Sequence, residues 1–504
     1  MRDRETELKF QISPEAISRL ETHPLLAAAL EVEENLLHSV YFDTPQFKLR
    51  QAGLVWRIRS IGDRRVQTVK ATAGGGIGRH EWECDISDDV PDPSCITPSP
   101  ANALLRKKGL TEKLAPVFIT EVDRRSWNVE RGGSLIEISL DLGRIVAGKQ
   151  SLPVSEVEFE LKQGAVRDLF ALAREMANDV PLTLDLLPKS AIGYRLAAGK
   201  MGPEPELPEP GLRPDMPLVD GFRSLCNACM KHLMLNEPIL VATRDPEALH
   251  QTRTAIRRLR AVLRVFARLV KDESLPGLRD ELKWLSRVLG SARDLDVMSD
   301  DFRSHNKTQH LSIAMAAKRT RAYASVMEAV GSQRYRNLLL DFCAWLECAP
   351  WTTQPLRPKS QGAFQDICLR EIGRWDRKII ERGAGLSKLD AQERHAIRID
   401  AKSFYYIGVL TQSLMPRSSR KSHAAYLKAL KDFQTTLGNL NDAHVAQEAA
   451  RALTVPNGDA AERVLAKAAK HAATRHARKE RKLVDDALET YGAFAKAPRA
   501  WPSR

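Results

Sequence analysis

Near its start, the chain alternates charged and apolar residues at a spacing that suits the binding of a cation and an anion together. The segment E-T-E-L-K would place Glu5, Glu7 and Lys9 on one face of a β-strand, with Leu8 and Phe10 on the other face. Two neighbouring carboxylates repel each other unless a cation lies between them. The spacing therefore predicts a divalent metal that holds an anion, with the lysine assisting from the side.

Four further stretches within the first 200 residues carry charged or polar side chains at alternate positions, with apolar residues between them. Strands of both charge signs, each with an apolar opposite face, indicate a closed antiparallel barrel with a charged interior. The alternative is a set of solvated sheet faces joined by cross-strand ion pairs, which is less favoured because five strands share the pattern. The alternating positions are Arg57 and Arg59; Glu81 and Glu83; Glu137, Ser139 and Asp141; and Glu156, Glu158, Glu160 and Lys162.

The second half of the chain contains a duplicated basic pattern. H-Q-T-R-T-A-I-R-R-L-R starts at residue 250 and H-A-I-R-I-D-A-K-S-F-Y starts at residue 395, and each is followed by an L-G-x-x-x-D segment, at 289–294 and 437–442. Each copy places a histidine and two basic residues at i, i+3 and i+7, which share one face of a helix. The first helix continues its stripe through Arg260. The duplicated positions are His250, Arg253 and Arg257 in the first copy and His395, Arg398 and Lys402 in the second.

Two such helices, related by the repeat, would bring two basic faces together along one groove or pore. For a single basic helix a solvated surface is the simpler explanation, but the duplication favours a shared anion site. The histidines lack carboxylate or cysteine partners at metal-binding spacing, so we expect them to hydrogen-bond phosphate or to pack between helices.

Composition and charge restrict the class of protein. The chain has 504 residues, of which 43% are apolar and 28% charged, as in a soluble globular protein. The net charge of +13 is unevenly distributed: residues 1–200 hold 27 Lys and Arg against 29 Asp and Glu, whereas residues 217–504 hold 49 against 31. A polyanion is therefore the expected partner of the second half. Nucleic acid is not expected, because aromatic content is only 6% and the basic helices lack interleaved stacking residues.

The sequence also favours a cytoplasmic protein. No apolar run approaches 18 residues and no secretory signal is visible, so we expect no membrane association. Seven thinly spread cysteines predict reduced thiols. Cys226 and Cys229 form a C-x-x-C without a second pair, and structural burial is more expected there than a metal or redox role.

Residues 201–217 contain six prolines and form the clearest boundary in the chain. We expect an α+β multidomain protein: a tunnel domain at 1–200, a linker at 201–217, and an all-α domain at 218–490 with repeats at about 218–345 and 360–490. Helices are expected at 14–30 and 165–178 within the first domain.

The ordered motifs E-T-E-L-K, R-I-R, T-V-K, E-W-E, R-x-x-W, I-E-I-S-L-D and E-V-E-F-E-L-K resemble the CYTH family of triphosphate tunnel metalloenzymes over about residues 1–200. The duplicated H-x-x-R-x-x-x-[RK] and L-G-x-x-x-D units resemble a CHAD domain over about 217–490. The whole chain is similar to the bacterial inorganic triphosphatases that fuse the two.

This resemblance implies an eight-stranded antiparallel β tunnel with flanking helices that binds a triphosphate together with Mg²⁺ or Mn²⁺. It assigns metal binding to four carboxylates and phosphate binding to six basic residues. It also implies a catalytic role for Glu5, Glu7, Lys9 and Lys70 and places Glu81, Glu83 and Asp141 in the tunnel lining. The four carboxylates are Glu5, Glu7, Glu158 and Glu160; the basic residues are Lys9, Arg57, Arg59, Lys70, Arg124 and Lys189.

One motif departs from the family pattern. The family often ends this region with S-K-x-x-R-G-Y, whereas this chain reads P-K-S-A-I-G-Y, so Lys189 is kept, Ile192 replaces the arginine and Arg195 follows three residues later. One phosphate contact is therefore in question. A one-residue shift of the strand would also put Arg125 in the tunnel in place of Arg124.

The resemblance implies metal-dependent hydrolysis of inorganic triphosphate to pyrophosphate and phosphate, with inorganic polyphosphate bound by the helical domain. The alternatives are a thiamine triphosphatase, a class IV-type adenylate cyclase, or a polyphosphate-binding protein without catalysis. A cytoplasmic location with association to polyphosphate granules would fit these partners. The sequence leaves the oligomeric state open.

Overall fold

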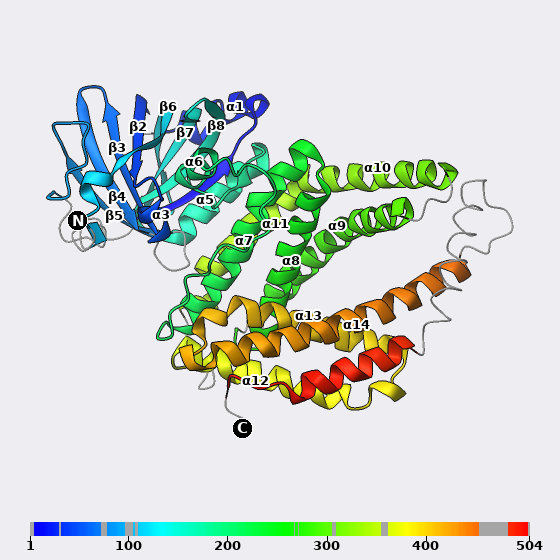
Figure 1. The fold of residues 1–504 in the computed structure, drawn as a ribbon. Helices are drawn as coiled ribbons and strands as arrows, with labels where there is room; N and C mark the ends of the chain where they lie inside the picture. Colours follow the sequence, from blue (N-terminus) through cyan, green and yellow to red (C-terminus); the bar gives the residue numbers. More distant parts are fainter. Residues whose placement is uncertain are drawn as a thin grey trace. The chain divides into compact units, whose positions relative to one another are not determined.

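The structure is a computed structural model. It describes residues 5–29, 32–71, 78–95, 104–105, 109–266, 268–270, 272–304, 309–353, 361–452 and 482–501. The chain divides into two compact units (Figure 1). The first unit comprises 1–206, 230–242 and 329–353; the second comprises 207–229, 243–328 and 354–504.

The first unit is built on one antiparallel sheet in which nine strands are described. Eight strands pair in the order β5-β4-β3-β2-β6-β7-β8-β1, and β1 also pairs with β5, which closes the sheet into a ring. The expected eight-stranded antiparallel barrel is therefore confirmed, but a ninth, two-residue strand adds to β1. The strands are β1 (Glu5–Gln11), β2 (Val32–Asp43), β3 (Leu54–Ile61), β4 (Arg64–Ala71), β5 (Gly78–Asp85), β6 (Ala115–Arg131), β7 (Ser134–Ala147), β8 (Gln150–Gln163) and β9 (Thr183–Leu184).

The strand register brings the alternating charges together. On β1 and β8, Glu7 lies opposite Glu160 and Lys9 lies opposite Glu158. The intervening Leu8 is fully buried on the other face. Because successive side chains point to opposite faces, the charged rows of all the strands share the inner face of the ring.

Several helices of the first unit pack against strands of the sheet, chiefly α6 on β6 and β7, α5 on β8, and α3 on β3. The single helix expected at 14–30 is split, because Pro24 lacks the N–H that a helix interior requires, and His23 instead caps a new helix. The helix expected at 165–178 is confirmed within one residue, and it buries Leu169 and Met176. The helices are α1 (Pro14–Glu21), α2 (Pro24–Ala27), α3 (Lys48–Gln51), α5 (Val166–Asp179) and α6 (Lys189–Ala197).

α6 packs against an aromatic cluster on β2 and β6. Tyr41 stacks on Phe118 with ring centroids 4.3 Å apart, and the ring of Tyr194 meets Phe118 edge-on. Gly193 permits this approach, since a Cβ there would lie 2.3 Å from the Phe118 ring. The packing holds the first residue of α6, Lys189, at the charged face of the strands.

The second unit is helical, and two of its helix pairs correspond to the sequence repeat. α8 with α9 and α13 with α14 form the two hairpins, and α13 packs on α8 (Figure 1). The expected duplicated helical bundle is confirmed. α7 runs through both units, and α11 lies in the first unit. The helices are α7 (Leu218–Thr243), α8 (Pro246–Phe266), α9 (Leu275–Ser304), α10 (Gln309–Gly331), α11 (Gln333–Cys348), α12 (Phe364–Gly383), α13 (Ala391–Leu410) and α14 (Arg420–Ala452).

Residues 201–217 form neither helix nor strand, and α7 begins directly after them. The first part of this segment is nevertheless held in place. The Arg195 guanidinium donates to the Glu204 carboxylate at 2.8 Å and to the Gly202 carbonyl at 2.9 Å, and the buried His232 and Asn236 side chains donate to the Glu204 carbonyl. The segment is therefore anchored to the first unit.

The structure corrects the expectation that all cysteines are reduced, because Cys84 of β5 and Cys95 form a disulfide. Cys226 and Cys229 are free and fully buried on α7, which supports their structural role, and burial raises the pKa of both thiols. Among the described helices, none has the length and apolar character needed to cross a membrane.

Candidate functional site

Three inward-facing carboxylates of the barrel converge on Lys189. The Lys189 Nζ lies 2.7 Å from Asp141 Oδ2, 2.7 Å from Glu156 Oε2 and 2.8 Å from Glu158 Oε1. Burial alone would lower the pKa of Lys189, but the three carboxylates raise it well above its usual value. Burial would conversely raise the pKa of Glu158, which Lys189 and Arg124 hold well below its usual value. All four groups are therefore charged near neutral pH.

Arg124 belongs to the same charge cluster as Lys189, and its contacts show which residue of β6 faces the interior of the ring. Its guanidinium donates two hydrogen bonds to Asp141, both at 2.6 Å, and a further one to Glu158. Arg125 instead pairs with Glu21 and Glu34. The inward-facing residue is therefore Arg124, and the one-residue shift of the strand does not occur.

Lys9 belongs to the same charge cluster and forms ion pairs with two carboxylates, one on β8 and one that the sequence pattern did not reveal. Its Nζ lies 2.8 Å from Glu156 Oε1 and 3.3 Å from Asp185 Oδ2, and Gln11 donates to both carboxylates. Although burial lowers the pKa of Lys9, Asp185 and Glu156 raise it above its usual value. Gln11 continues the alternation of β1 and was detectable from that pattern, whereas Asp185 follows the short β9 outside any strand motif.

The opposite side of the ring is basic, and one arginine there forms no ion pair with any described residue. Arg59 donates to the Ser39 hydroxyl at 3.1 Å and, within the described residues, forms no ion pair. Burial, together with Arg57 and Arg124, lowers its pKa to about 10. Cations held this close without a carboxylate partner indicate a site for an anion.

Arg57 and Lys70 lie beside Arg59 and face the acids of β5. Arg57 donates to the Thr68 hydroxyl at 3.1 Å and lies 3.9 and 3.8 Å from oxygens of Glu81 and Glu83. The Lys70 Nζ lies 3.1 Å from Glu81 Oε2. These contacts are longer than those around Lys189, so the basic side is less completely neutralised.

Tyr41 is a residue of this basic side that the charge pattern did not reveal. It is buried opposite Arg57 on the neighbouring strand. Burial alone would raise its pKa, but Arg57 and Arg59 lower it below the usual value for tyrosine. Its place on β2, in phase with Ser39, was the signal available in the sequence.

The carboxylates expected to bind metal are partly engaged by lysine. Glu7 lies opposite Glu160 in the register, and Lys162 Nζ lies 3.1 Å from Glu137 Oε1 and 2.7 Å from Glu160 Oε2. Two carboxylates thus converge on one cation position, and their oxygens are ligands that Mg²⁺ and Mn²⁺ prefer. Among the described residues, no three His, Cys, Asp or Glu side chains lie close enough to hold a metal ion as they stand. The side chain of Glu5 lies outside the described residues.

At position 192 of α6, where the family motif has an arginine, this chain has an apolar residue. Ile192 packs in the cluster around Phe118 and Tyr194. Arg195 is buried but directed to Glu204 and Gly202. It therefore does not replace the missing arginine in the ring.

The helical unit brings the two copies of its repeat together in matching environments. A Cβ added to Gly290 of α9 would lie 3.6 Å from Arg253 Nε, and one added to Gly438 of α14 would lie 3.7 Å from Arg398 Nε. In each hairpin, the glycine of the L-G motif therefore lies beside the arginine of the H-x-x-R motif. The match explains why the two motifs recur as a pair.

The arginines on the facing sides of α8 and α13 lie close to one another, and the described part of the chain supplies no carboxylate ion pair to Arg253, Arg257 or Arg398. Burial, with Arg253 and Arg398 as neighbouring cations, lowers the pKa of Arg257 to about 10, although Tyr406 partly opposes them. Among the described residues, Arg253 and Arg398 form no ion pair, and the Arg253 Nε is buried without a hydrogen-bond partner. The arrangement resembles the cluster of arginines around Arg59 in the barrel.

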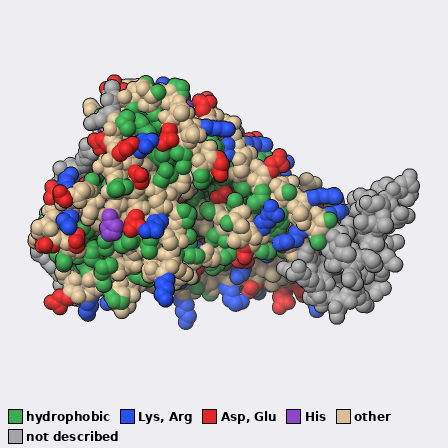
Figure 2. Space-filling model, turned by 90° about the horizontal axis from the view of Figure 1, so that it is seen from above, with side chains coloured by type: hydrophobic (Ala, Val, Ile, Leu, Met, Phe, Trp, Pro, Cys, Tyr) green, Lys and Arg blue, Asp and Glu red, His purple; other side chains and the backbone are tan. Residues whose placement is uncertain are grey.

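The remaining residues expected on this face have varied contacts. The His395 imidazole is hydrogen-bonded to the Asn441 side chain, and Arg260 donates to the Ser286 hydroxyl at 3.0 Å. His250 is partly buried, and burial with the nearby Arg293 lowers its pKa. Lys402 lies one turn beyond Arg398 on α13. On the molecular face seen in Figure 2, acidic and basic side chains are interspersed.

Comparisons with known proteins agree with this architecture. The family model of the CYTH domain matches residues 3–185, and that of the CHAD domain matches residues 224–451. The first part of the chain therefore matches the CYTH domain and the second part matches the CHAD domain.

An inorganic triphosphatase of Haemophilus influenzae is 31% identical over 201 residues, which cover 38% of this chain and 55% of the relative. The chain thus spans about half the length of that curated relative. A CHAD domain from Ricinus communis is 27% identical, covers 58% of this chain and 97% of its own, and has a TM-score of 0.48. HpAC1 from Hippeastrum, described as an adenylyl cyclase with a dominant triphosphatase activity, is 17% identical, covers 40% of this chain and 98% of its own, and has a TM-score of 0.30.

Proposed function

We propose that the barrel hydrolyses inorganic triphosphate to pyrophosphate and phosphate with Mg²⁺ or Mn²⁺, and that the helical unit binds inorganic polyphosphate. The observation that carries the first part is Arg59, a partly buried arginine that lies near Arg57 and Arg124 and has no ion-pair partner among the described residues. A polyphosphate ester or anhydride is the anion that such a cluster would bind, because a chain of phosphoryl groups carries several negative charges. The inorganic triphosphatase among the relatives supports this substrate.

In this proposal the two sides of the ring have different roles. Arg57, Arg59 and Lys70 hold phosphoryl oxygens on the basic side, while Arg124 and Lys189 reach them from the acidic side. Catalysis then rests on positioning and on neutralising the charge of the transferring group, as phosphoryl transfer requires.

Four carboxylates, Glu5, Glu7, Glu158 and Glu160, would hold the metal. The bound cation would supply additional positive charge to the phosphoryl oxygens. In the structure, Lys162 and Lys189 neutralise two of these acids. With a metal held at these carboxylates, the ammonium groups of Lys162 and Lys189 would be available to contact phosphate.

The test of this function is phosphate release from a panel of substrates. The panel holds tripolyphosphate, ATP, thiamine triphosphate and long-chain polyphosphate, each with Mg²⁺, with Mn²⁺ and with chelator. We expect tripolyphosphate to have the highest kcat/KM. Faster hydrolysis of thiamine triphosphate, or formation of cyclic AMP from ATP, would replace the proposed reaction with one of its alternatives.

Replacing an arginine of the basic side should weaken binding of the transition state without unfolding the barrel. For Arg57→Ala and for Arg59→Ala we expect a loss of about 1.5–3 kcal/mol in kcat/KM for tripolyphosphate, the scale of a charged hydrogen bond. Arg→Lys should restore only part of it, since lysine lacks the planar fork. Arg125→Ala, on the outer face, is the matched control. Unchanged kcat/KM in both inner variants would show that the basic side does not contact substrate.

The second part of the proposal rests on the crowded arginines of α8 and α13. Inorganic polyphosphate would lie along the face formed by His250, Arg253, Arg257 and Arg260 on one helix and by His395, Arg398 and Lys402 on the other. A cytoplasmic location beside polyphosphate granules follows from this proposal. The domain boundaries proposed from the sequence, 1–200 and 218–490, would assign one ligand to each.

Charge reversal on both helices should show whether they share one ligand. Because α11 and part of α7 pack in the first unit, the test uses the full chain. All proteins compared also carry Arg57→Ala and Arg59→Ala, which reduce polyphosphate binding by the barrel. We expect Arg253→Glu with Arg398→Glu to weaken polyphosphate binding more than either change alone, and wild-type binding to fall steeply with salt, as for other polyanions.

Lys388→Glu, an exposed change in the same unit, is the control for net charge. The affinity of each variant for polyphosphate is measured by titration and compared with its affinity for DNA of equal charge. Tighter binding to DNA, or equal effects of Lys388→Glu and the double variant, would contradict the polyphosphate proposal.

A further inference from the structure

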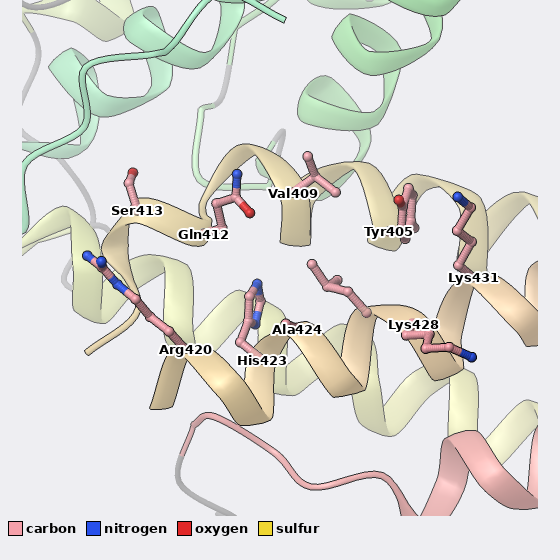
Figure 3. A pocket seen from close by; sticks show the side chains of 10 residues that line it. Tyr405, Val409, Gln412, Ser413, Arg420, His423, Ala424, Lys428 and Lys431 are labelled. Atoms are coloured by element: carbon pink, nitrogen blue, oxygen red, sulfur yellow. The ribbon is translucent and has the colours of Figure 1, made fainter. Parts of the chain in front are cut away.

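A groove between α13 and α14 lies outside both proposed sites. Its volume is about 630 Å³, within the range of small-molecule pockets. Val409 and Leu427 contribute an apolar centre, and Tyr405 contributes an aromatic wall. Gln412 and Ser413 lie at one end, and Lys428 and Lys431 at the other (Figure 3).

The charged side chains that line this groove are all basic. Residues 411–431 contain five lysines and arginines and no aspartate or glutamate. Among the described residues, Arg420 and Lys431 line the groove without an ion pair, whereas Lys428 is paired with Asp432 at 2.8 Å. An anion is therefore the counter-charge that this groove lacks.

The first turn of α14 carries basic residues where acidic residues are usual, and this arrangement favours anion binding. Arg420 and Lys421 occupy the first turn of this 33-residue helix, which has no acidic residue there. The helix dipole disfavours cations at this end and attracts anions. A bound phosphate beside Arg420 would reverse the unfavourable arrangement.

His423 adds a feature that an inorganic anion does not explain. It lines the groove, is 3% exposed, and donates from Nε2 to the Gly408 carbonyl at 2.9 Å (Figure 3). Its Nδ1 is buried without a partner among the described residues. Burial lowers the pKa of His423, although the bond to Gly408 partly opposes this effect. A neutral imidazole that donates from Nε2 has an acceptor at Nδ1, which calls for an N–H or O–H donor.

A fully ionised phosphate chain offers no such donor and gains nothing from an apolar centre, whereas a nucleobase and ribose offer both a flat ring and donors. We propose that the α13–α14 groove binds a nucleoside polyphosphate, with its base and ribose over Tyr405, Val409 and Leu427 and its phosphates beside Arg420 at the start of α14. This site goes beyond the proposed function and does not depend on it.

The test uses the full chain with excess tripolyphosphate present, so that the barrel is occupied. Adenosine and guanosine 5′-(β,γ-imido)triphosphates are titrated by calorimetry, and 8-azidoadenosine triphosphate is used to photolabel the protein for peptide mapping. We expect one of the two analogues to bind, and the label to fall on peptides within residues 405–431.

Arg420→Glu should weaken binding of the analogue at least about tenfold, the effect of losing one charge-assisted hydrogen bond. Val409→Trp should abolish labelling by filling the groove, and because Arg420 is exposed, its variant keeps the test valid if Val409→Trp fails to fold. Lys388→Glu, an exposed change outside the groove lining, is the matched charge control. The proposal is overturned if neither analogue binds at millimolar concentration, if labelling is confined to the barrel, or if Lys388→Glu weakens binding as much as Arg420→Glu.

Discussion

Lys189→Met should abolish triphosphate hydrolysis and destabilise the barrel. Lys189 is the shared partner of Asp141, Glu156 and Glu158, all within 2.8 Å. Its removal leaves buried carboxylates with too few counter-charges, and breaking one side of a buried ion pair costs about 3–5 kcal/mol of folding free energy. It also removes a proposed phosphate ligand, so we expect kcat/KM to fall at least about 100-fold. Urea unfolding and phosphate release measure the two effects.

The loss of folding stability in Lys189→Met should become smaller as the pH falls. Despite their burial, Lys189 and its neighbouring cations hold the pKa of Asp141, Glu156 and Glu158 below the usual values. A carboxyl with a lowered folded-state pKa stabilises the fold above its unfolded pKa of about 4, and this stabilisation is lost as pH falls through the folded-state value. The difference between wild type and Lys189→Met should therefore be largest near neutral pH and shrink below about pH 4.

Lys162→Met is the matched control for this pH dependence. Lys162 also bridges two carboxylates, but its side chain and both partners are 20–22% exposed, so solvent can replace the lost charge. A smaller and flatter effect is expected. Equal losses in the two variants, or a Lys189→Met difference that does not change with pH, would contradict the role of Lys189 as the centre of a buried charge network.

Removal of divalent cations should abolish hydrolysis of tripolyphosphate. The proposed metal ligands include Glu7 and Glu160, which lie opposite each other on β1 and β8. Without the metal, their charges and those of the triphosphate repel, so substrate and carboxylates cannot share the ring. We expect activity to vanish in excess chelator and to return with Mg²⁺ or Mn²⁺. Full activity in chelator would contradict the metal requirement.

Glu7→Gln should reproduce much of this loss while preserving the fold. The change removes one ligand charge but keeps the side-chain shape, and we expect at least about a 100-fold fall in kcat, with a higher Mn²⁺ concentration needed for half-maximal activity. Calorimetric titration of Mn²⁺ in the absence of substrate measures the binding separately from the reaction. Glu121→Gln, on an exposed ion pair with Arg144, is the control. Unchanged Mn²⁺ affinity in Glu7→Gln would remove this residue from the metal site.

Much of the barrel was predictable, because strand alternation has a period of two that charged and apolar residues display directly. The ordered pairs Arg57 with Arg59 and Glu158 with Glu160 mark strands whose opposite faces are apolar, and the observed sheet places them on one face. The repeat in the helical unit was predictable for a similar reason. A helix period of 3.6 sets His250 and Arg253 on one face, and the second copy carries the same spacing.

The sequence by itself determined which side chains share a face, because local periodicity depends only on backbone geometry. It did not determine which faces meet. Only the closed ring brings Asp141, Glu156 and Glu158 to the single ammonium of Lys189, since α6 is placed by its packing on Phe118. Only the observed pairing of β6 directs Arg124 inward and Arg125 outward. The disulfide between Cys84 and Cys95, the contact of Asp185 with Lys9, and the closeness of Arg257 to Arg398 likewise depend on long-range packing. Burial of apolar surface controls that packing, and short motifs do not encode it.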